Sequence, residues 1–173
     1  VLYTAAGPEI AVASTKAYTT QLSVFYLVVA KMALLRGVYT EEQTKSFIAE
    51  LERVPEVMQK VLEKRRDIHV IAKKILEAKD LFMIGRGLDY SILLEGSLKL
   101  KEVSYIQSEA YASGELKHGP IALITTNTPV VATVTQEKLM SKELSNIKEV
   151  KSRGADIVLS VSYTHLRAHE TVL

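Results

Sequence analysis

The sequence predicts an α/β fold in which helices cover a parallel sheet. Short apolar runs recur at residues 81–84, 129–134 and 156–159, and two of them are followed by segments with helical spacing. The run at 81–84 follows a charged pair and ends at a glycine, which is typical of a buried parallel strand. Alternating strands and helices favour a parallel sheet with helices packed against it.

The first long helix is expected at residues 16–36. Its apolar side chains lie nearly all round the helix, so we expect deep burial. Ser14 is the candidate N-cap, and Gly37 is the expected end of the helix.

The next segment predicts two further helices. Thr40 and Gln43 have the spacing of a capping box, which begins a helix that we expect to end near Arg53. Pro55 is expected to begin the second helix, because proline is tolerated in a first turn. Apolar spacing then continues to Ala78.

A glycine turn follows the strand at 81–84. Gly85, Arg86 and Gly87 are candidate ligand-binding residues, and Asp89 is a candidate N-cap for a helix over residues 90–106. Strand, glycine turn and helix start together can hold an anion or a polar ligand on backbone N–H groups. Taken alone, a glycine pair after a strand is more often only a turn.

Three charged residues share one face of the helix at 90–106. Glu95, Lys99 and Glu102 stand at i, i+4 and i+7. An exposed face with paired charges, worth about 0.3–0.5 kcal/mol per pair, is the simplest interpretation. Because the same helix is rich in small and apolar residues, the row is also a candidate acid/base cluster.

Residues 108–120 are predicted to be a loop, because they contain two glycines and a proline. The segment carries His118 next to Lys117. Most loop histidines are only surface residues, but a histidine that titrates near neutrality is also a natural proton-transfer group.

The last predicted elements are a helix over residues 138–153, ended by Gly154, and the strand at 156–159. The character of the sequence changes at 160–173, which shows no periodicity, and we expect a non-native tail. His165 and His169 stand at i, i+4, but no third ligand is placed, so no metal site is predicted.

Two segments carry a resemblance to a known family. The stretch GRGLDYSILLEGSLKLKEVSYIQSEAYASGELKHGP at 85–120 and AVASTKAYTTQL at 11–22 resemble the isomerase domain of the glutamine–fructose-6-phosphate aminotransferases. The resemblance extends from Ala5 to about Leu159. It implies a truncated αβα sandwich of the sugar-isomerase (SIS) type, preceded by long connector helices. The implied parts are the end of a first SIS lobe (1–37), a helical connector (38–80) and the beginning of a second lobe (81–159).

The resemblance also implies a reaction. In this family fructose 6-phosphate receives an amino group from glutamine, and the isomerase domain forms glucosamine 6-phosphate without a metal or organic cofactor. Glu102 would move the proton between C1 and C2, and Lys99 would assist. His118 would help to open the sugar ring, reaching the neighbouring subunit of a homodimer. Val12 would contact the sugar through its backbone, and Ser14 through its hydroxyl.

Several parts of the family pattern lie outside this sequence. They are the glutaminase domain, a phosphate loop expected before Val1, and a Schiff-base lysine expected beyond the family-like region. Gln107 stands where family members often have histidine. We therefore expect the fragment to be inactive alone. A regulatory module that binds phosphosugars and a deglycase-type sugar isomerase are the alternatives.

Composition restricts the other classes of function. The formal net charge of +2 gives no reason to expect nucleic-acid binding. The absence of cysteine excludes disulfides and thiolate catalysis, and it fits a cytoplasmic location. The longest apolar segment, Leu22–Leu35, is interrupted by Ser23 and Lys31, so no membrane partner is expected.

Overall fold

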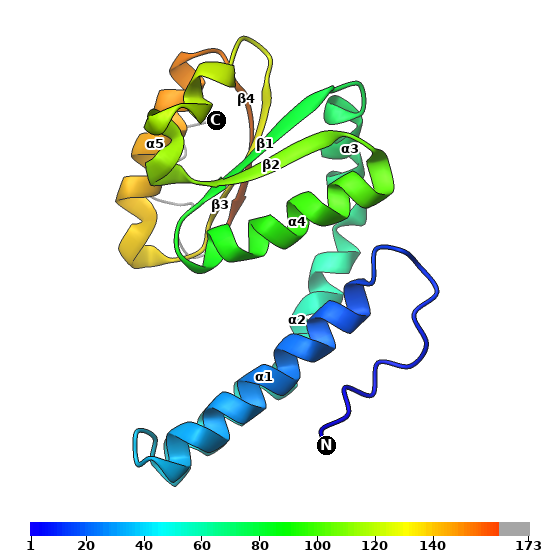
Figure 1. The fold of residues 1–173 in the computed structure, drawn as a ribbon, viewed down its shortest axis with the longest axis vertical. Coiled ribbons are helices and arrows are strands. Elements are labelled where there is room, and N and C mark those ends of the chain that lie inside the picture. Colours follow the sequence, from blue (N-terminus) through cyan, green and yellow to red (C-terminus); the bar gives the residue numbers. More distant parts are fainter. Residues whose placement is uncertain (163–173) are drawn as a thin grey trace. The chain divides into compact units, whose positions relative to one another are not determined.

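The computed structural model describes residues 1–162, which divide into two compact units (Figure 1). The first unit comprises residues 1–70 and the second begins at Ile71. Two long helices form most of the first unit, α1 (Thr15–Leu35) and α2 (Glu41–Glu63). Helix α3 (Arg65–Ile75) spans the division.

The turn between α1 and α2 is built as the sequence predicts. Gly37 has a φ of 68°, and Thr40 forms the expected capping box. The Thr40 backbone N–H donates to Gln43 Oε1 at 2.8 Å, and the Gln43 N–H donates to Thr40 Oγ1 at 3.2 Å. Edge-on contact of the Tyr26 and Phe47 rings, with centroids 6.1 Å apart, holds the two helices together.

The expectation of two separate helices around Pro55 was wrong. Pro55 lies inside α2, which runs unbroken past the end predicted near Arg53. Proline removes one backbone hydrogen bond there, and the good helix formers on both sides continue the helix. Ser14 is the N-cap residue of α1, as the sequence predicts, although it adopts a left-handed conformation and its side chain makes no capping hydrogen bond.

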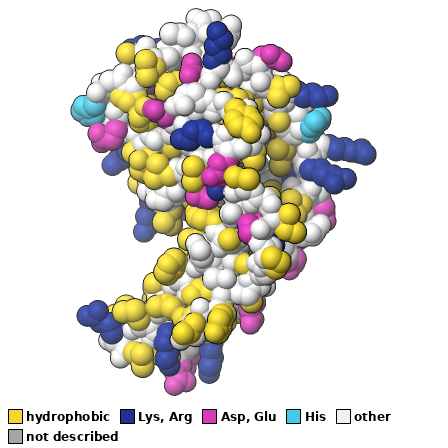
Figure 2. Space-filling model, turned by 45° about the vertical axis from the view of Figure 1, so that its right-hand side comes forward, with side chains coloured by type: hydrophobic (Ala, Val, Ile, Leu, Met, Phe, Trp, Pro, Cys, Tyr) yellow, Lys and Arg dark blue, Asp and Glu magenta, His cyan; other side chains and the backbone are white. Residues whose placement is uncertain are grey.

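Helix α1 is also not deeply buried in the described part of the chain. Ala30 is its single buried residue, whereas Phe25 is 65% exposed. Figure 2 shows the hydrophobic side chains that this leaves on the surface of α1 and α2. By length and mean hydropathy α1 could cross a membrane, but core helices of soluble proteins often have the same composition.

The second unit contains a sheet of four parallel strands in the order β2-β1-β3-β4 (Figure 1). This confirms the parallel α/β prediction. The strands are β1 (Asp80–Gly85), β2 (Gln107–Ala112), β3 (Pro129–Val134) and β4 (Asp156–Val161). The connections are α4 (Leu88–Ser104), the 3₁₀ turns η1 (Ser113–His118), η2 (Pro120–Leu123) and η3 (Glu137–Leu139), and α5 (Met140–Ser152).

The core lies on both faces of the sheet, because alternate residues of β1 point to opposite sides. Leu81 and Met83 pack with Leu93 of α4, whereas Phe82 and Ile84 pack with Ile147 of α5. The second unit therefore has three layers, with α4 on one face and α5 on the other.

Two boundaries in this unit differ from the predictions. The segment predicted as a loop from 108 begins instead as strand β2, which pairs with β1 along its whole length. The segment lacks β-branched residues, so its pairing with β1 decides its structure. Strand β4 continues to Val161, so Ser160 and Val161 belong to the sheet rather than to a tail. His165 and His169 lie outside the described residues.

Candidate functional site

The carboxyl edge of the sheet gathers three of the segments that follow strands. Gly85 pairs with Ala112, so the glycine turn after β1 and the turn η1 after β2 begin side by side. Thr135 and Gln136 follow β3, the other neighbour of β1. Strand β1 leads to α4 on one face, and β3 leads to α5 on the other. The connections from β1 and β3 thus leave the sheet in opposite directions, and open parallel sheets bind ligands between two such strands.

The glycine turn is closed by contacts with the end of β3. Gly87 has a φ of 56°, and an added Cβ would lie 2.9 Å from Gln136 Oε1. Gln136 Nε2 donates to the Arg86 carbonyl oxygen at 2.7 Å. Gly87 is therefore required both for its backbone conformation and for the close approach of Gln136.

Asp89 does not act as the predicted N-cap, because α4 already begins at Leu88. The Asp89 carboxylate is buried and accepts from the backbone N–H of Thr135 at 2.9 Å and from the Thr135 hydroxyl. This carboxylate joins the start of α4 to the end of β3.

The Arg86 side chain is held by α5. Arg86 Nη2 donates to Asn146 Oδ1 at 2.7 Å, and Arg86 Nε lies 3.5 Å from Glu143 Oε2. The guanidinium lies against Gly114, where an added Cβ would approach Arg86 Nη2 to 3.2 Å. Arg86, which the sequence predicts to bind substrate, is thus already paired with side chains of α5.

Glu143 is a buried carboxylate that the sequence analysis missed. The residue is 1% exposed, and it accepts from the Ser113 hydroxyl at 2.6 Å. Burial raises the pKa of Glu143 and the Asp89 charge adds to this, whereas the Ser113 hydrogen bond and the Arg86 charge oppose it. Glu143 lies one helical turn before Ile147, on the inward face of α5. A charged residue in the apolar positions of a helix is a sign of a buried polar contact, and this sign could have identified Glu143 from the sequence.

The predicted charged row forms on α4. Lys99 Nζ lies 2.7 Å from Glu102 Oε2 and 3.4 Å from Glu95 Oε1. Hydrogen bonding to Glu102 raises the pKa of Lys99, with a smaller contribution from Glu95, so the ammonium is cationic at neutral pH. The three side chains are 20–27% exposed, whereas Val103 beside them is 64% exposed.

The row does not lie next to the glycine turn. Glu102 is 14 residues beyond Leu88, the first residue of α4, which corresponds to about 20 Å along the helix axis. This separation is longer than a hexose phosphate. Lys99 and Glu102 are thus brought together with each other, but not with Gly85–Gly87.

The remaining candidates lie on separate segments. His118 ends η1 and is exposed, with Nε2 3.9 Å from Glu115 Oε2. Val12 and Ser14 belong to the first unit, in the segment before α1. Within residues 1–162, no three His, Asp or Glu side chains are grouped to hold a metal ion.

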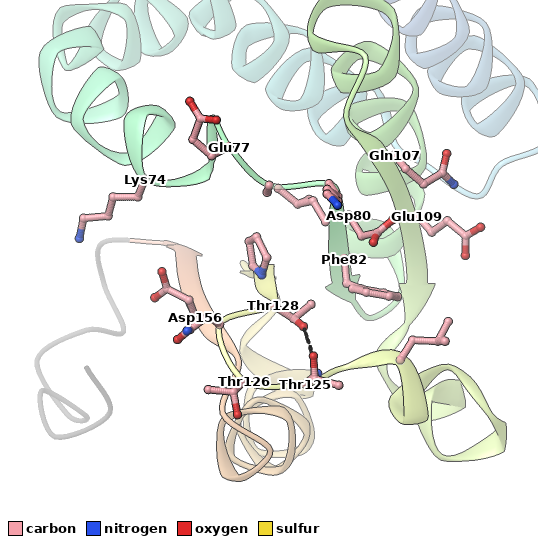
Figure 3. Close-up of a pocket in the computed structure, with 16 residues that line it drawn as sticks. Lys74, Glu77, Asp80, Phe82, Gln107, Glu109, Thr125, Thr126, Thr128 and Asp156 are labelled. Atoms are coloured by element: carbon pink, nitrogen blue, oxygen red, sulfur yellow. Dashed lines mark hydrogen bonds between the residues drawn. The ribbon is translucent and has the colours of Figure 1, made fainter.

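A cavity of about 630 Å³ lies at the opposite, amino edge of the sheet (Figure 3). Its labelled side chains come from the strands near their beginnings, as with Asp80 and Asp156, and from the turn in which Thr125 and Thr128 are hydrogen-bonded. Lys74 at the end of α3 and Glu77 just after it also line the cavity. Parallel sheets rarely place their ligands at this edge.

Comparison with known proteins identifies a domain family and several similar proteins. The family model of the SIS domain matches residues 74–164. Glutamine–fructose-6-phosphate aminotransferase [isomerizing] of Caldanaerobacter subterraneus is 50% identical over 99% of this chain, and that of Methanosarcina acetivorans is 51% identical over 91%. The chain spans 28% and 26% of the length of these two curated relatives.

A solved structure agrees with the sequence comparison. The C-terminal domain of glucosamine-fructose-6-phosphate aminotransferase from Francisella tularensis matches with a TM-score of 0.86 and 43% identity. The match covers 94% of this chain and 45% of that chain. Because α1 has 21 residues, more than the unmatched 6% of this chain, at least part of α1 lies within the match.

Proposed function

Because this chain belongs to the SIS domain family, we propose that it forms part of the isomerase site of a glutamine–fructose-6-phosphate aminotransferase. The observation that carries this proposal is the pairing of Lys99 with Glu102 inside the matched region, at 2.7 Å. The substrate would be a hexose phosphate, and no metal or organic cofactor is required for this chemistry.

The charged row suits a proton transfer between neighbouring carbon atoms. Glu102 would accept the proton from C1 of the ketose imine and return it at C2, as a general base and then a general acid. The cationic Lys99 would stabilise the negative charge that develops on the enediol-like intermediate. A binding module without turnover needs no such pair, which favours an enzyme over a regulatory sensor.

The other candidates would support this step. His118 would assist ring opening, in the neighbouring subunit of a homodimer, and Val12 and Ser14 would contact the sugar. A substrate-binding role for Gly85, Arg86 and Gly87 stays a prediction. We also propose a cytoplasmic location and no membrane or nucleic-acid partner.

A chimera tests the proposal, because the chain spans only part of its relatives. The chain would replace the matched segment of the Caldanaerobacter enzyme, with which it shares 50% identity. We expect the chimera to form glucosamine 6-phosphate from fructose 6-phosphate and glutamine. Hexose phosphate binding without product would instead indicate a regulatory module. Product formation with ammonia but not glutamine would show an isomerase site that works but is no longer coupled to glutamine hydrolysis.

The substitution Glu102→Gln then tests the role of the carboxylate. Gln keeps the shape of the side chain but cannot accept the proton, so product formation should fall by roughly 10²–10⁴-fold. Glutamate release from glutamine should largely survive. Equal loss of both activities would indicate misfolding, and retention of both would remove Glu102 from the mechanism.

A further inference from the structure

The buried carboxylate of Glu143 lies between two segments that follow neighbouring strands. One oxygen, Oε1, accepts from Ser113 at the start of η1, and the other, Oε2, faces Arg86 Nε of the glycine turn at 3.5 Å. Both Glu143 Oε2 and Arg86 Nε are buried and have no hydrogen-bond partner, so the ion pair between them is the contact that each of these two atoms makes. Within the described residues, the carboxylate is thus held by one hydrogen bond from the first segment and one ion pair with the second.

Turn η1 is short, and its polar contacts lead to α5. Ser113 is completely buried, and Leu116 is inserted into the core beside Ile147. Lys117 Nζ contacts Glu149 Oε1 at 3.3 Å, but the Lys117 side chain is 63% exposed, so this pair is weak. Glu143 is thus the buried polar anchor of the turn that ends in His118.

We propose that Glu143 is a positioning residue for His118, acting through Ser113 and the backbone of η1. Arg86 holds the second carboxylate oxygen, and Asn146 holds Arg86 in turn. The glycine turn and η1 are therefore fixed to one side chain of α5. The catalytic consequence rests on the role proposed for His118, whereas the anchoring of η1 does not.

The anchoring can be measured on the chain itself by amide hydrogen exchange. In Glu143→Gln the charge that faces Arg86 is lost, and in Ser113→Ala the hydroxyl that reaches Glu143 is lost while the Glu143–Arg86 pair remains. Both variants should lose protection at residues 113–118 by about 10-fold or more, relative to the core strand β3. Lys148→Gln, which removes an exposed charge from the same helix, is the matched control and should leave protection unchanged. Unchanged exchange in a folded Ser113→Ala protein would overturn the proposal.

The consequence for His118 is tested by a double-mutant cycle in the chimera described above. Glu143→Gln should lower kcat for glucosamine 6-phosphate by about 10-fold to 10²-fold, as small displacements of catalytic groups do. KM should change much less, and glutamate release should persist. In a His118→Ala background the same substitution should cost little more, because its effect acts through His118.

The outcomes separate this inference from the proposed function. If the unsubstituted chimera makes no product, the proposed function is overturned, and the exchange measurement still decides whether Glu143 anchors η1. If the chimera is active but the losses from Glu143→Gln and His118→Ala multiply, Glu143 does not act through His118 and only this inference fails.

Discussion

Lys99 and Glu102 form the closest ion pair on α4, with Lys99 Nζ 2.7 Å from Glu102 Oε2. The two residues are one helical turn apart, and Glu95 completes the row on the other side of Lys99 at 3.4 Å. One ammonium thus lies between two carboxylates, which stabilise its charged form. The arrangement predicts how Lys99 should titrate.

Glu102→Gln should lower the pKa of Lys99, because Glu102 makes the largest contribution to its upward shift. The Lys99 side-chain carbon resonances, followed by NMR through an alkaline titration, report this pKa directly. Glu95→Gln is the matched control, and it should lower the pKa less. Equal effects of the two substitutions would contradict the unequal distances of Glu102 and Glu95 from Lys99.

The α/β arrangement could be predicted because its signals are local. The apolar runs that became β1, β3 and β4 are bounded by charges or turns, and the capping box at Thr40 is a contact between residues three apart. The row of Glu95, Lys99 and Glu102 follows from helical spacing alone.

The features that were missed depend on tertiary contacts. Strand β2 has little β propensity and forms because it pairs with β1. Asp89 was predicted to cap its own helix, but its partner, Thr135, is 46 residues away. Glu143 meets Ser113 across 30 residues, and no local pattern carries that contact.

Gly87→Ala should destabilise the second unit by about 1–3 kcal/mol, because alanine is strained at this backbone conformation. Its φ of 56° and the 2.9 Å approach to Gln136 Oε1 both oppose a side chain. Urea unfolding measures the loss. Gly96→Ala in α4 is the control, since its Cβ would meet only Met83 Sδ at 3.6 Å. That substitution should be neutral or stabilising by up to about 1 kcal/mol, and equal losses at the two glycines would refute the argument.

Residues 160–162 should contribute to stability, although they follow the predicted end of the last strand. Ser160 pairs with Thr133, Val161 pairs with Val134 and packs against the core, and the Ser162 N–H donates to the Val134 carbonyl at 3.4 Å. A chain ending at Leu159 should therefore be less stable than one ending at Ser162 by about 1–3 kcal/mol. Thermal or urea unfolding of both chains gives the difference. Identical midpoints would show that the sheet effectively ends at Leu159.

Glu143 should make stability depend on pH in a defined direction. Burial raises the pKa of Glu143 above its ordinary value of 4.5, so the folded protein binds this proton more tightly than the unfolded chain does. The corresponding contribution to stability is fully present below the unfolded pKa and is lost as the pH rises through the folded pKa.

The unfolding free energy of the parent chain, relative to that of Glu143→Gln, should therefore decrease as the pH rises above about 4.5. The groups that face this carboxylate are Arg86, Asp89 and Ser113. Urea unfolding of both proteins at several pH values measures the slope, and Glu137→Gln, at an exposed position, should show no comparable trend. A difference that grows in favour of the parent chain as the pH rises would mean that the Arg86 charge outweighs burial, and that Glu143 is held as a stabilised carboxylate.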